Sequence, residues 1–582
     1  MAQVAEVSTH AAVSAPTVGA LWQRAIDARR TQAAFLEEHD GVWREVAWEA
    51  AGERVSALAN GFLSLGAEKG DRVAILCRTR LEWTLTDYAL ATIGAVVVPI
   101  YPTSSASEVG FVLGDSATTI LVAEDEEQLA KLAGQELPAL TRVVGIDVAG
   151  PDGTLADVES AGWEYARAHP DALARAAGDV GPDDILTFLY TSGTTGNPKG
   201  CVLTQRNYVA MVDSVVAVDD LFQTGDTALL FLPLAHNFAR LIQFAGAAVG
   251  YTLAFCPDVR GVSAALAQVR PTLFPSVPRV YEKVFTSVKG QIAESSFIKR
   301  RLGEWALGVG ARGGGGLRGR VADKLVLGKV RARMGGRLRF AVSGGAPLAR
   351  EVADFFAACG VVILEGYGMT ECTTAATINR PHRHRFGTVG QALPGIELAL
   401  DTDGEVLIRG ETVFGGYYGN AEATAEVLTA EGWLRSGDIG VIDSDGYLSI
   451  TDRKKDIIVT AGGKNVAPQV IENALKNSPY VSQVLVVGDN RPYLVALFTV
   501  DPEATAALGP PGGPEVHAAI AATVETANRD LGRVEQIKRF VVLPRDFSIE
   551  EGEITPTLKL KRRVCIEHFR DELEELYAAA RD

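Results

Sequence analysis

The sequence predicts an α/β fold in which a large N-terminal domain, made of two β-α lobes and a small β-rich subdomain, precedes a smaller α+β C-terminal domain. Three observations support this prediction. The chain has 582 residues, 47% of them hydrophobic, and is too long for one ordinary domain. Apolar β-branched runs alternate with amphipathic stretches as far as Glu365. Short alternating strands with tight turns begin beyond Gln391.

The first predicted lobe extends from about Leu21 to Ala176. Its amphipathic stretches, such as residues 46–65, predict helices. Apolar runs that we interpret as strands alternate with these stretches, at residues 73–76, 96–101, 120–123 and 143–146. This alternation predicts β-α units around a parallel sheet.

The same alternation restarts near Gly181 and predicts a second lobe beside the first. Its apolar, strand-like runs lie at residues 185–190, 227–232, 251–255, 272–276, 339–343 and 361–365. The longest apolar run, residues 244–256, is shorter than the ~20 residues that span a bilayer. We interpret it as a buried helix and strand.

The last part of the chain predicts two smaller units. Asp403-Gly404 and Asp445-Gly446 are typical hairpin turns, so we expect a β-rich subdomain after Gln391. The pattern beyond Asp456 predicts a compact α+β domain, with helices at 469–477, 515–531 and after Arg563, a hairpin at 481–500 and a strand at 536–543. The expected division is an N-terminal arm (1–18), a large domain (19–453), a hinge (454–456) and a C-terminal domain (457–582).

Composition excludes several classes of protein. A formal net charge of -16 argues against nucleic-acid binding, because that function needs a basic face. The six cysteines have no paired spacing, so we expect neither disulfides nor a zinc site, and a cytoplasmic location fits. The first twenty residues lack the basic start and apolar stretch of a secretory signal.

The segment from Tyr190 to Gly200 follows an apolar strand and is the most informative part of the sequence. Its glycines let backbone N–H groups turn toward an anion, its hydroxyls donate hydrogen bonds, and its lysine adds positive charge. A Walker loop is excluded, because that motif needs Gly before the lysine and Ser or Thr after it. An ordinary turn is the alternative. The candidate polyphosphate-binding residues are Thr191, Ser192, Gly193, Thr194, Thr195, Gly196 and Lys199.

Two later segments each follow a predicted strand. In the first, glycine lets a flat ring approach the backbone closely; its candidates are Gly344, Gly345, Ala346 and Pro347. The second offers an aromatic face, a hydroxyl and a carboxylate; its candidates are Glu365, Gly366, Tyr367, Gly368, Met369, Thr370 and Glu371. Considered alone, Glu371 is as readily a solvated loop acid.

Asp438 lies in a tight loop, residues 432–440, before a predicted hairpin. A carboxylate in such a loop can accept hydrogen bonds from both ribose hydroxyls of a nucleotide. A turn-capping Asp is the alternative.

In their order and spacing these motifs resemble those of the adenylate-forming (AMP-binding) superfamily, which includes acyl-CoA ligases, luciferases and peptide-synthetase adenylation domains. The resemblance covers roughly residues 20–575. Residues 431–456 and 275–284 resemble the long-chain fatty acyl-CoA synthetase branch in particular.

The resemblance implies an acyl-CoA synthetase-like fold and an acid–thiol ligase. Fatty acid, ATP and coenzyme A would give acyl-CoA, AMP and pyrophosphate through an acyl-adenylate, with Mg²⁺ bound and the C-terminal domain rotating between the two half-reactions. The alternatives are an enzyme that stops at the adenylate or loads a carrier-protein thiol, a ligase for another aliphatic or aromatic acid, and a nucleotide-binding scaffold without catalysis. Chain length, homodimer formation and peripheral membrane association stay open.

The resemblance also implies roles for single residues. Residues 343–347 would line the adenine pocket, Tyr367 would stack on adenine, and Thr370 would contact the α-phosphate. Glu371 would bind magnesium with help from Thr194. Asp438 and Arg453 would hold the ribose.

For the moving parts, the resemblance implies a hinge at Lys455 and an adenylation lysine at Lys559. Lys561 is the alternative for the adenylation lysine, because Thr-Leu precedes Lys559 where many relatives have Ser-Gly. Gly462 and Gly463 would leave room for pantetheine. His236 would adjoin the acyl carboxylate, with a structural histidine as the alternative. Arg240, near the predicted apolar entrance, is expected to meet a phosphate or carboxylate, or to face solvent.

Overall fold

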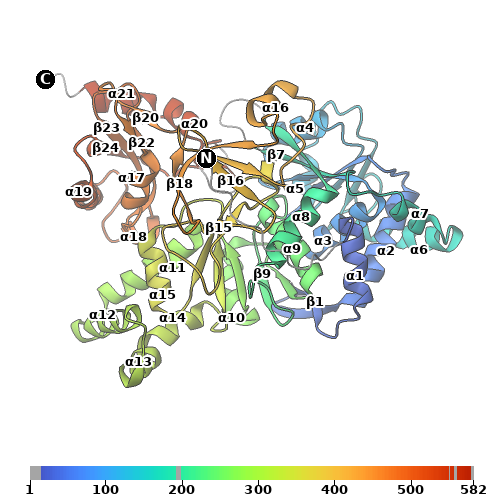
Figure 1. The fold of residues 1–582 in the computed structure, drawn as a ribbon, viewed down its shortest axis with the longest axis horizontal. Helices are drawn as coiled ribbons and strands as arrows, with labels where there is room; N and C mark the ends of the chain where they lie inside the picture. Colours follow the sequence, from blue (N-terminus) through green and yellow to red (C-terminus); the bar gives the residue numbers. More distant parts are fainter. Residues whose placement is uncertain (1–14, 192–197, 549–550, 556–559, 579–582) are drawn as a thin grey trace.

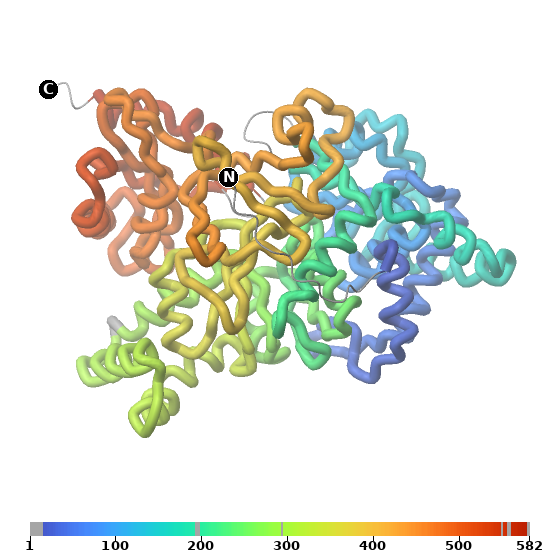
Figure 2. The backbone as a smooth tube through the Cα atoms, viewed as in Figure 1, coloured from blue at the N-terminus to red at the C-terminus, as the bar shows by residue number. Residues whose placement is uncertain are grey.

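The computed structural model describes residues 15–191, 198–548, 551–555 and 560–578. Two large sheets form the centre of the N-terminal part, and the C-terminal residues pack as a separate α+β unit at one corner (Figures 1 and 2). The side chains fall into separate cores, because the largest hydrophobic cluster ends at Leu448 and the next begins at Ile458.

The first sheet has six strands in the order β6-β5-β3-β4-β7-β8. Its strands are β3 (Arg72–Leu76), β4 (Val96–Ile100), β5 (Ile120–Ala123), β6 (Arg142–Gly145), β7 (Ile185–Thr191) and β8 (Lys199–Thr204). All neighbours are parallel except β7 and β8, which form an antiparallel hairpin. The predicted parallel sheet of the first lobe is confirmed.

The second sheet has nine strands in the order β15-β14-β13-β12-β11-β9-β10-β1-β2. Its strands are β1 (Ala33–His39), β2 (Val42–Ala47), β9 (Thr227–Leu230), β10 (Thr252–Phe255), β11 (Leu273–Ser276), β12 (Phe340–Ser343), β13 (Ile363–Tyr367), β14 (Thr377–Ile378) and β15 (Gln391–Ala392). The core strands β10, β9, β11, β12 and β13 are parallel.

One strand joins a different sheet from the one that the sequence predicted, and another, β1, was not predicted as a strand. The run at 185–190, predicted for the second lobe, pairs with β4 of the first sheet, and the hydroxyl of Thr187 donates to the carbonyl oxygen of Val97 at 2.6 Å. Conversely, β1 from the N-terminal part pairs with β10, with Phe35 opposite Leu253. Periodicity identifies strands but not their partners, so this part of the prediction was wrong.

Helices fill the space between the sheets and cover their outer faces (Figure 1). Helices α1, α3, α8 and α9 pack on one another, and their side chains share one core with both sheets. In the N-terminal part the helices are α1 (Val18–Asp27), α2 (Trp48–Ser64), α3 (Leu81–Ile93), α4 (Ala106–Asp115), α5 (Glu126–Ala130), α6 (Leu155–Ala168), α7 (Ala172–Gly178), α8 (Gln205–Val216), α9 (Asn237–Val249), η1 (Val259–Gly261), α10 (Val262–Val269), α11 (Pro278–Glu294), α15 (Arg350–Ala358) and η3 (Thr370–Cys372). The predicted helix and strand within residues 244–256 are confirmed as parts of α9 and β10.

Arg240 on α9 is fully buried in this core. Its Nη2 lies 2.6 Å from Oδ1 of Asp87 on α3, and its guanidinium lies 5.1 Å from the ring centroid of Tyr208. A buried charge is stable only when it is paired and hydrogen-bonded, as here. Of the expectations for Arg240, the solvent-facing position was wrong, and the carboxylate that it meets is that of Asp87 within the core.

The subdomain and the C-terminal unit agree with the predicted pattern. A four-stranded sheet contains β16 (Glu397–Leu400), β17 (Glu405–Arg409), β18 (Leu434–Ile442) and β19 (Leu448–Arg453), with α16 (Ala421–Val427) beside it. Both predicted hairpin turns are present, with φ of +86° at Gly404 and +82° at Gly446. The C-terminal elements are β20 (Ile458–Val459), β21 (Asn465–Val466), α17 (Pro468–Leu475), β22 (Val481–Val487), β23 (Leu494–Val500), α18 (Pro502–Thr505), α19 (Pro514–Asp530), β24 (Ile537–Val542), α20 (Arg562–His568) and α21 (Arg570–Ala578).

A helical projection extends from the second lobe, at the lower left of Figure 1. It consists of α12 (Phe297–Ala311), α13 (Gly316–Ala322), the π-helical turn η2 (Asp323–Leu327) and α14 (Gly328–Arg333). The glycine run at 313–316 turns the chain between α12 and α13, and Gly313, Gly314 and Gly316 all have positive φ.

Two expected absences concern the described residues only. All six cysteines are buried and unpaired there. Among the same residues, no helix combines the length and the apolar character that crossing a membrane requires.

Candidate active site

The ends of the predicted phosphate loop lie side by side. Thr191 ends β7 and Lys199 begins β8, and the two are register partners in the hairpin. The loop residues Ser192, Gly193, Thr194, Thr195 and Gly196 lie outside the described residues. The hairpin fixes where both ends of this loop emerge from the first sheet.

Glu371, on η3, lies close to that hairpin through Tyr417. The Tyr417 hydroxyl donates to Oε1 of Glu371 at 2.7 Å, and the Lys199 ammonium lies 5.1 Å from the Tyr417 ring centroid. Glu371 is only 8% exposed. Burial, followed by the negative charge of Glu371, raises the pKa of Tyr417 well above its ordinary value, so its hydroxyl stays a donor. A carboxylate and an ammonium are thus held around one aromatic ring beside the phosphate loop.

The predicted adenine segment begins where β12 and β13 run in parallel, with Ser343 opposite Glu365. Among the described residues, neither the Ser343 hydroxyl nor Oε1 of Glu365 has a hydrogen-bond partner, although both atoms are buried. The other Glu365 oxygen accepts from the backbone N–H of Leu348 at 3.3 Å, just beyond Ala346 and Pro347. Gly345 has φ of +84°, which favours glycine. Buried polar atoms without partners are costly, so they indicate a place for polar ligand atoms.

Glu365 gives the first testable prediction. Burial raises the pKa of Glu365 from 4.5 to about 7. Between these values the folded protein holds a proton that the unfolded chain has lost, so the free energy of unfolding falls as the pH rises through this window. We expect Glu365→Gln to remove that slope and to stabilise the protein by up to about 3 kcal/mol at the alkaline end. Urea unfolding at several pH values checks this, and a slope unchanged in the variant contradicts it.

The predicted ribose residues form one cluster. Asp438 on β18 is opposite Arg453 on β19, whose Nε donates to Oδ1 of Asp438 at 3.0 Å. The Tyr367 hydroxyl donates to Oδ2 of the same carboxylate at 2.7 Å. Burial and the Asp438 charge raise the pKa of Tyr367 well above its ordinary value. The structure therefore brings together the residues predicted to hold adenine and ribose.

Residues 366–370, between the ribose cluster and Glu371, are tightly packed. A side chain on Gly368 would approach the carbonyl oxygen of Thr374 to 2.1 Å, so only glycine fits there. Gly366 pairs with Ile378 in the sheet. Met369 and Thr370 begin η3, and the Thr370 carbonyl oxygen accepts from Asn237 Nδ2 at 3.4 Å.

His236 is the N-cap of α9, because its Nδ1 accepts from the backbone N–H of Phe238 at 3.1 Å. The imidazole is half-buried. The two residues after His236 lie beside the segments predicted to bind the nucleotide. Asn237 donates to the Thr370 carbonyl oxygen, and a Cβ added at Gly344 would lie 3.4 Å from the Phe238 ring. A capping role for His236 agrees with the structural alternative and leaves it near the candidate site.

The hinge region follows Arg453 directly. Lys454 contacts the β16–β17 turn, with its Nζ 2.5 Å from Asp403 and 3.0 Å from Glu405. Lys455 is exposed. The contacts of Lys454 therefore hold the chain in place immediately before Lys455, the predicted hinge residue.

Lys559 lies outside the described residues, but the segment that contains it is held at both ends. Ile554 bridges Leu560, and the backbone N–H of Lys561 donates to the carbonyl oxygen of Glu553 at 2.8 Å. The Lys561 ammonium lies 3.9 Å from Glu108 on α4.

Helix α4 also touches the strand that leads into the phosphate loop. The Phe111 ring packs edge-on against Tyr190 at 6.4 Å, and the Tyr190 hydroxyl donates to Asp115 at 2.6 Å. Lys561 therefore meets the same helix of the large domain that contacts Tyr190 near the end of β7.

Gly462 and Gly463 form an exposed turn between β20 and β21, with φ of +70° at Gly463. The C-terminal unit also contacts α11, where Arg279 donates to the Ser482 hydroxyl at 3.0 Å. Residues 275–284, which resemble the long-chain branch, thus partly face the C-terminal unit.

The donor set fits a magnesium ion. Glu371 supplies a hard carboxylate oxygen, and among the described residues its Oε2 accepts no hydrogen bond. Thr194, the second predicted ligand, lies outside the described residues. The structure thus describes one of the two predicted ligands.

Sequence reasoning missed Tyr417 and Glu405. Tyr417 follows two glycines in an irregular segment, which an isolated bridge to Cys201 and backbone hydrogen bonds of its neighbours place against β8. Glu405 is buried in a turn that looked solvent-exposed, where it also accepts from the Gly437 backbone N–H at 2.9 Å. Neither contact leaves a periodic pattern in the sequence.

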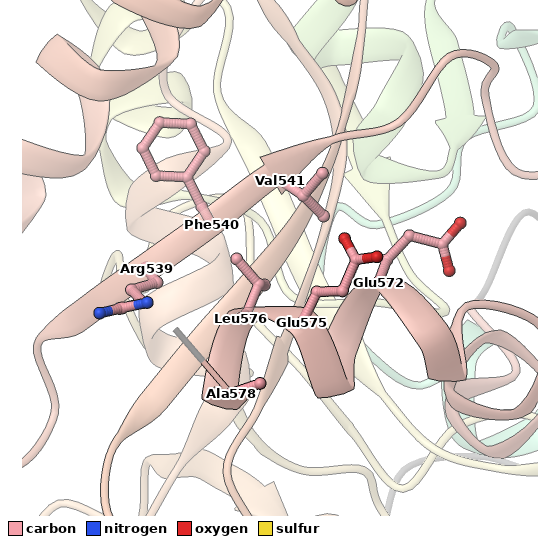
Figure 3. Close-up of a pocket in the computed structure, with 7 residues that line it drawn as sticks. All are labelled: Arg539, Phe540, Val541, Glu572, Glu575, Leu576 and Ala578. Atoms are coloured by element: carbon pink, nitrogen blue, oxygen red, sulfur yellow. The ribbon is translucent and has the colours of Figure 1, made fainter. Parts of the chain in front are cut away.

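A surface cavity of about 560 Å³ lies elsewhere, between β24 and α21 of the C-terminal unit (Figure 3). It is lined by Arg539, Phe540, Val541, Glu572, Glu575, Leu576 and Ala578. None of the predicted site residues lines it, so it is separate from the candidate active site.

Comparisons with known proteins agree with this arrangement. Residues 22–418 match the family model for AMP-binding enzymes, and residues 455–581 match the model for the AMP-binding enzyme C-terminal domain. The long-chain-fatty-acid–CoA ligase FadD15 of Mycobacterium bovis is 42% identical over 565 residues, which cover 92% of this chain and 93% of that protein. The peroxisomal long chain acyl-CoA synthetase 7 of Arabidopsis thaliana is 33% identical over 598 residues, covering 93% and 83%.

The fold also has counterparts among solved structures. The adenylation domain of a carboxylate reductase from Mycobacterium chelonae has a TM-score of 0.77 at 25% identity, covering 97% of this chain and 92% of that one. A fatty acyl CoA synthetase of Mycobacterium tuberculosis has a TM-score of 0.64 at 24% identity, covering 95% and 98%.

Proposed function

Because this chain belongs to the AMP-binding enzyme family, we propose that it is an AMP-forming long-chain fatty acid–CoA ligase. The observation that supports this most directly is the Lys199–Tyr417–Glu371 cluster beside the ends of the phosphate loop. The naming of the relatives as long-chain ligases supports the substrate class. The thiol acceptor is coenzyme A.

In the proposed first half-reaction, the fatty acid carboxylate attacks the α-phosphorus of ATP, and pyrophosphate leaves with the electrons of the broken P–O bond. Lys199 compensates phosphate charge, and the Tyr367–Asp438–Arg453 cluster holds the nucleoside. Lys559 bridges the attacking carboxylate and the α-phosphate, where fixed positive charge favours the transition state. A magnesium ion held by Glu371 and Thr194 would neutralise charge on the phosphates.

In the proposed second half-reaction, the thiol of coenzyme A attacks the acyl carbonyl carbon and AMP leaves. Groups that help pyrophosphate leave must make room for the thiol, so the C-terminal domain (457–582) rotates against the large domain (19–453) about residues 454–456. The break between the two hydrophobic cores at this point supports the division. Gly462 and Gly463 then line the pantetheine path.

The test is exchange of labelled pyrophosphate into ATP with magnesium and a panel of acids from acetate to long-chain fatty acids. We expect exchange with long-chain acids, and acyl-CoA with AMP once coenzyme A is added. Adenylate that accumulates regardless of coenzyme A would point to a carrier-protein thiol instead. Absence of exchange with every acid would refute the proposal.

Lys455→Pro tests the hinge. No described residue accepts a hydrogen bond from the Lys455 backbone N–H, so proline removes no such bond and acts by restricting backbone rotation. We expect thioester formation to fall at least tenfold more than pyrophosphate exchange. Lys455→Ala, which keeps the rotation, serves as the control. A defect confined to the exchange reaction would contradict this role.

A further inference from the structure

The helical projection exposes large apolar side chains at a distance in sequence from every predicted site residue. Phe297 and Ile298, which begin α12, are 62% and 79% exposed, and Leu317 on α13 is 77% exposed. Val321 and Leu325 follow at 41% and 42%. Apolar side chains gathered on one surface mark a site that contacts another molecule or a membrane.

The apolar residues of α13 and η2 share one face. Leu317, Val321 and Leu325 recur every four residues, whereas Gly319 and Ala322 between them are buried against the rest of the protein. A surface helix normally buries its apolar side and exposes its polar side. This segment is buried on one side and apolar on the exposed side, so packing against this chain does not account for the exposed apolar residues.

Basic side chains flank this exposed apolar line. At about 100° per residue, Arg318 lies on one side of the line and Arg320 and Lys324 lie on the other. All three are exposed, and no ion pair to them exists among the described residues. Arg331, by contrast, is paired with Asp323 at 2.6 Å.

The charge of the projection opposes that of the whole chain. Between residues 297 and 337, lysine and arginine outnumber acidic residues by eleven to two, although the chain has a formal net charge of -16. The excess of basic residues gives this projection a positive electrostatic potential on an otherwise acidic protein.

We propose that residues 297–327 form a surface that binds bilayers containing anionic phospholipids, with the Leu317–Val321–Leu325 line inserted at the interface. A helix with apolar residues on one face and Lys or Arg at its flanks is suited to lie in the headgroup region. The inference deepens the proposed function, because long-chain fatty acids partition into bilayers. Helix α11, which leads into the projection, begins at Pro278, within the segment that resembles the long-chain branch.

The test uses the full chain and vesicles in the absence of ATP and coenzyme A, so its outcome does not depend on ligase activity. We expect co-sedimentation with vesicles of phosphatidylcholine and phosphatidylglycerol, weakening as salt is raised. Binding to phosphatidylcholine alone should be much weaker. The variant Arg318→Gln/Arg320→Gln/Lys324→Gln should bind anionic vesicles about a hundredfold more weakly.

Leu317→Ser/Val321→Ser should weaken binding at high and low salt alike, because it removes the inserted groups. The matched control, Val42→Ser/Arg44→Gln on exposed strand β2, should bind like the parent chain. Equal binding by the triple variant and the parent chain would overturn the proposal. So would binding to duplex DNA without binding to vesicles. An unchanged circular dichroism melt checks that each variant is folded.

Discussion

Replacing Glu371 with glutamine is expected to lower pyrophosphate exchange by about 10²–10³-fold. The change keeps the shape and the hydrogen bond from Tyr417 but removes the negative charge that would face the divalent ion. Glu371 is 8% exposed, so solvent screens its charge little. Losing one preorganised charge at a transition state costs a rate factor of about this size.

The measurement is exchange rate against magnesium concentration for the parent chain and Glu371→Gln. The variant should need more magnesium for half its maximal rate, and an unchanged circular dichroism melt should show that it is folded. Tyr417→Phe is the matched comparison, because it removes only the hydroxyl that holds the carboxylate at 2.7 Å. We expect that change to cost about tenfold. An unaltered rate and magnesium dependence in Glu371→Gln would exclude this residue from metal binding.

Lys559→Ala is expected to reduce adenylation by about 10²–10³-fold while sparing the thiol step. The expectation follows from the resemblance, which implies that Lys559 is the adenylation lysine, and from the described neighbour Lys561, which lies 3.9 Å from Glu108 of the large domain. In the proposed first half-reaction Lys559 acts on the attacking carboxylate and the α-phosphate. Once the adenylate has formed, the same ammonium has no reacting group to stabilise.

Single-turnover assays separate the two steps, one starting from ATP and fatty acid and the other from supplied acyl-adenylate and coenzyme A. Lys561→Ala is the matched control, since its ammonium is already directed to α4. We expect it to cost much less than Lys559→Ala. If Lys561→Ala gave the larger adenylation defect, the assignment would move to Lys561; equal loss in both steps for Lys559→Ala would contradict the role altogether.

The sequence predicted the elements of the fold better than their partners. Parallel strands such as β3 and β4 are recognisable in the sequence as uninterrupted β-branched runs. The two hairpin turns of the subdomain are recognisable as Asp-Gly pairs. Pairing between Thr187 and Val97 leaves no such pattern, because it depends on contacts across 90 residues. The assignment of β7 to the second lobe failed for that reason.

The same distinction applies to the candidate site. Motifs identified Asp438, Tyr367 and Glu371, because each lies in a segment with unusual local composition. Tyr417 and Glu405 were missed, since their roles come from partners far away in the sequence. The raised pKa of Glu365 was likewise unpredictable, because it results from burial.

The exchange of strands between the two sheets has a consequence for how the chain can fold. The β1–β2 pair is made early in the sequence but completes the far edge of the nine-stranded sheet, while β7 and β8 close the six-stranded one. A nascent chain that ends near Gly181 would therefore leave β4 without β7 and β1 without β10. The two lobes must mature together as one cooperative unit, and neither should survive as an isolated fragment.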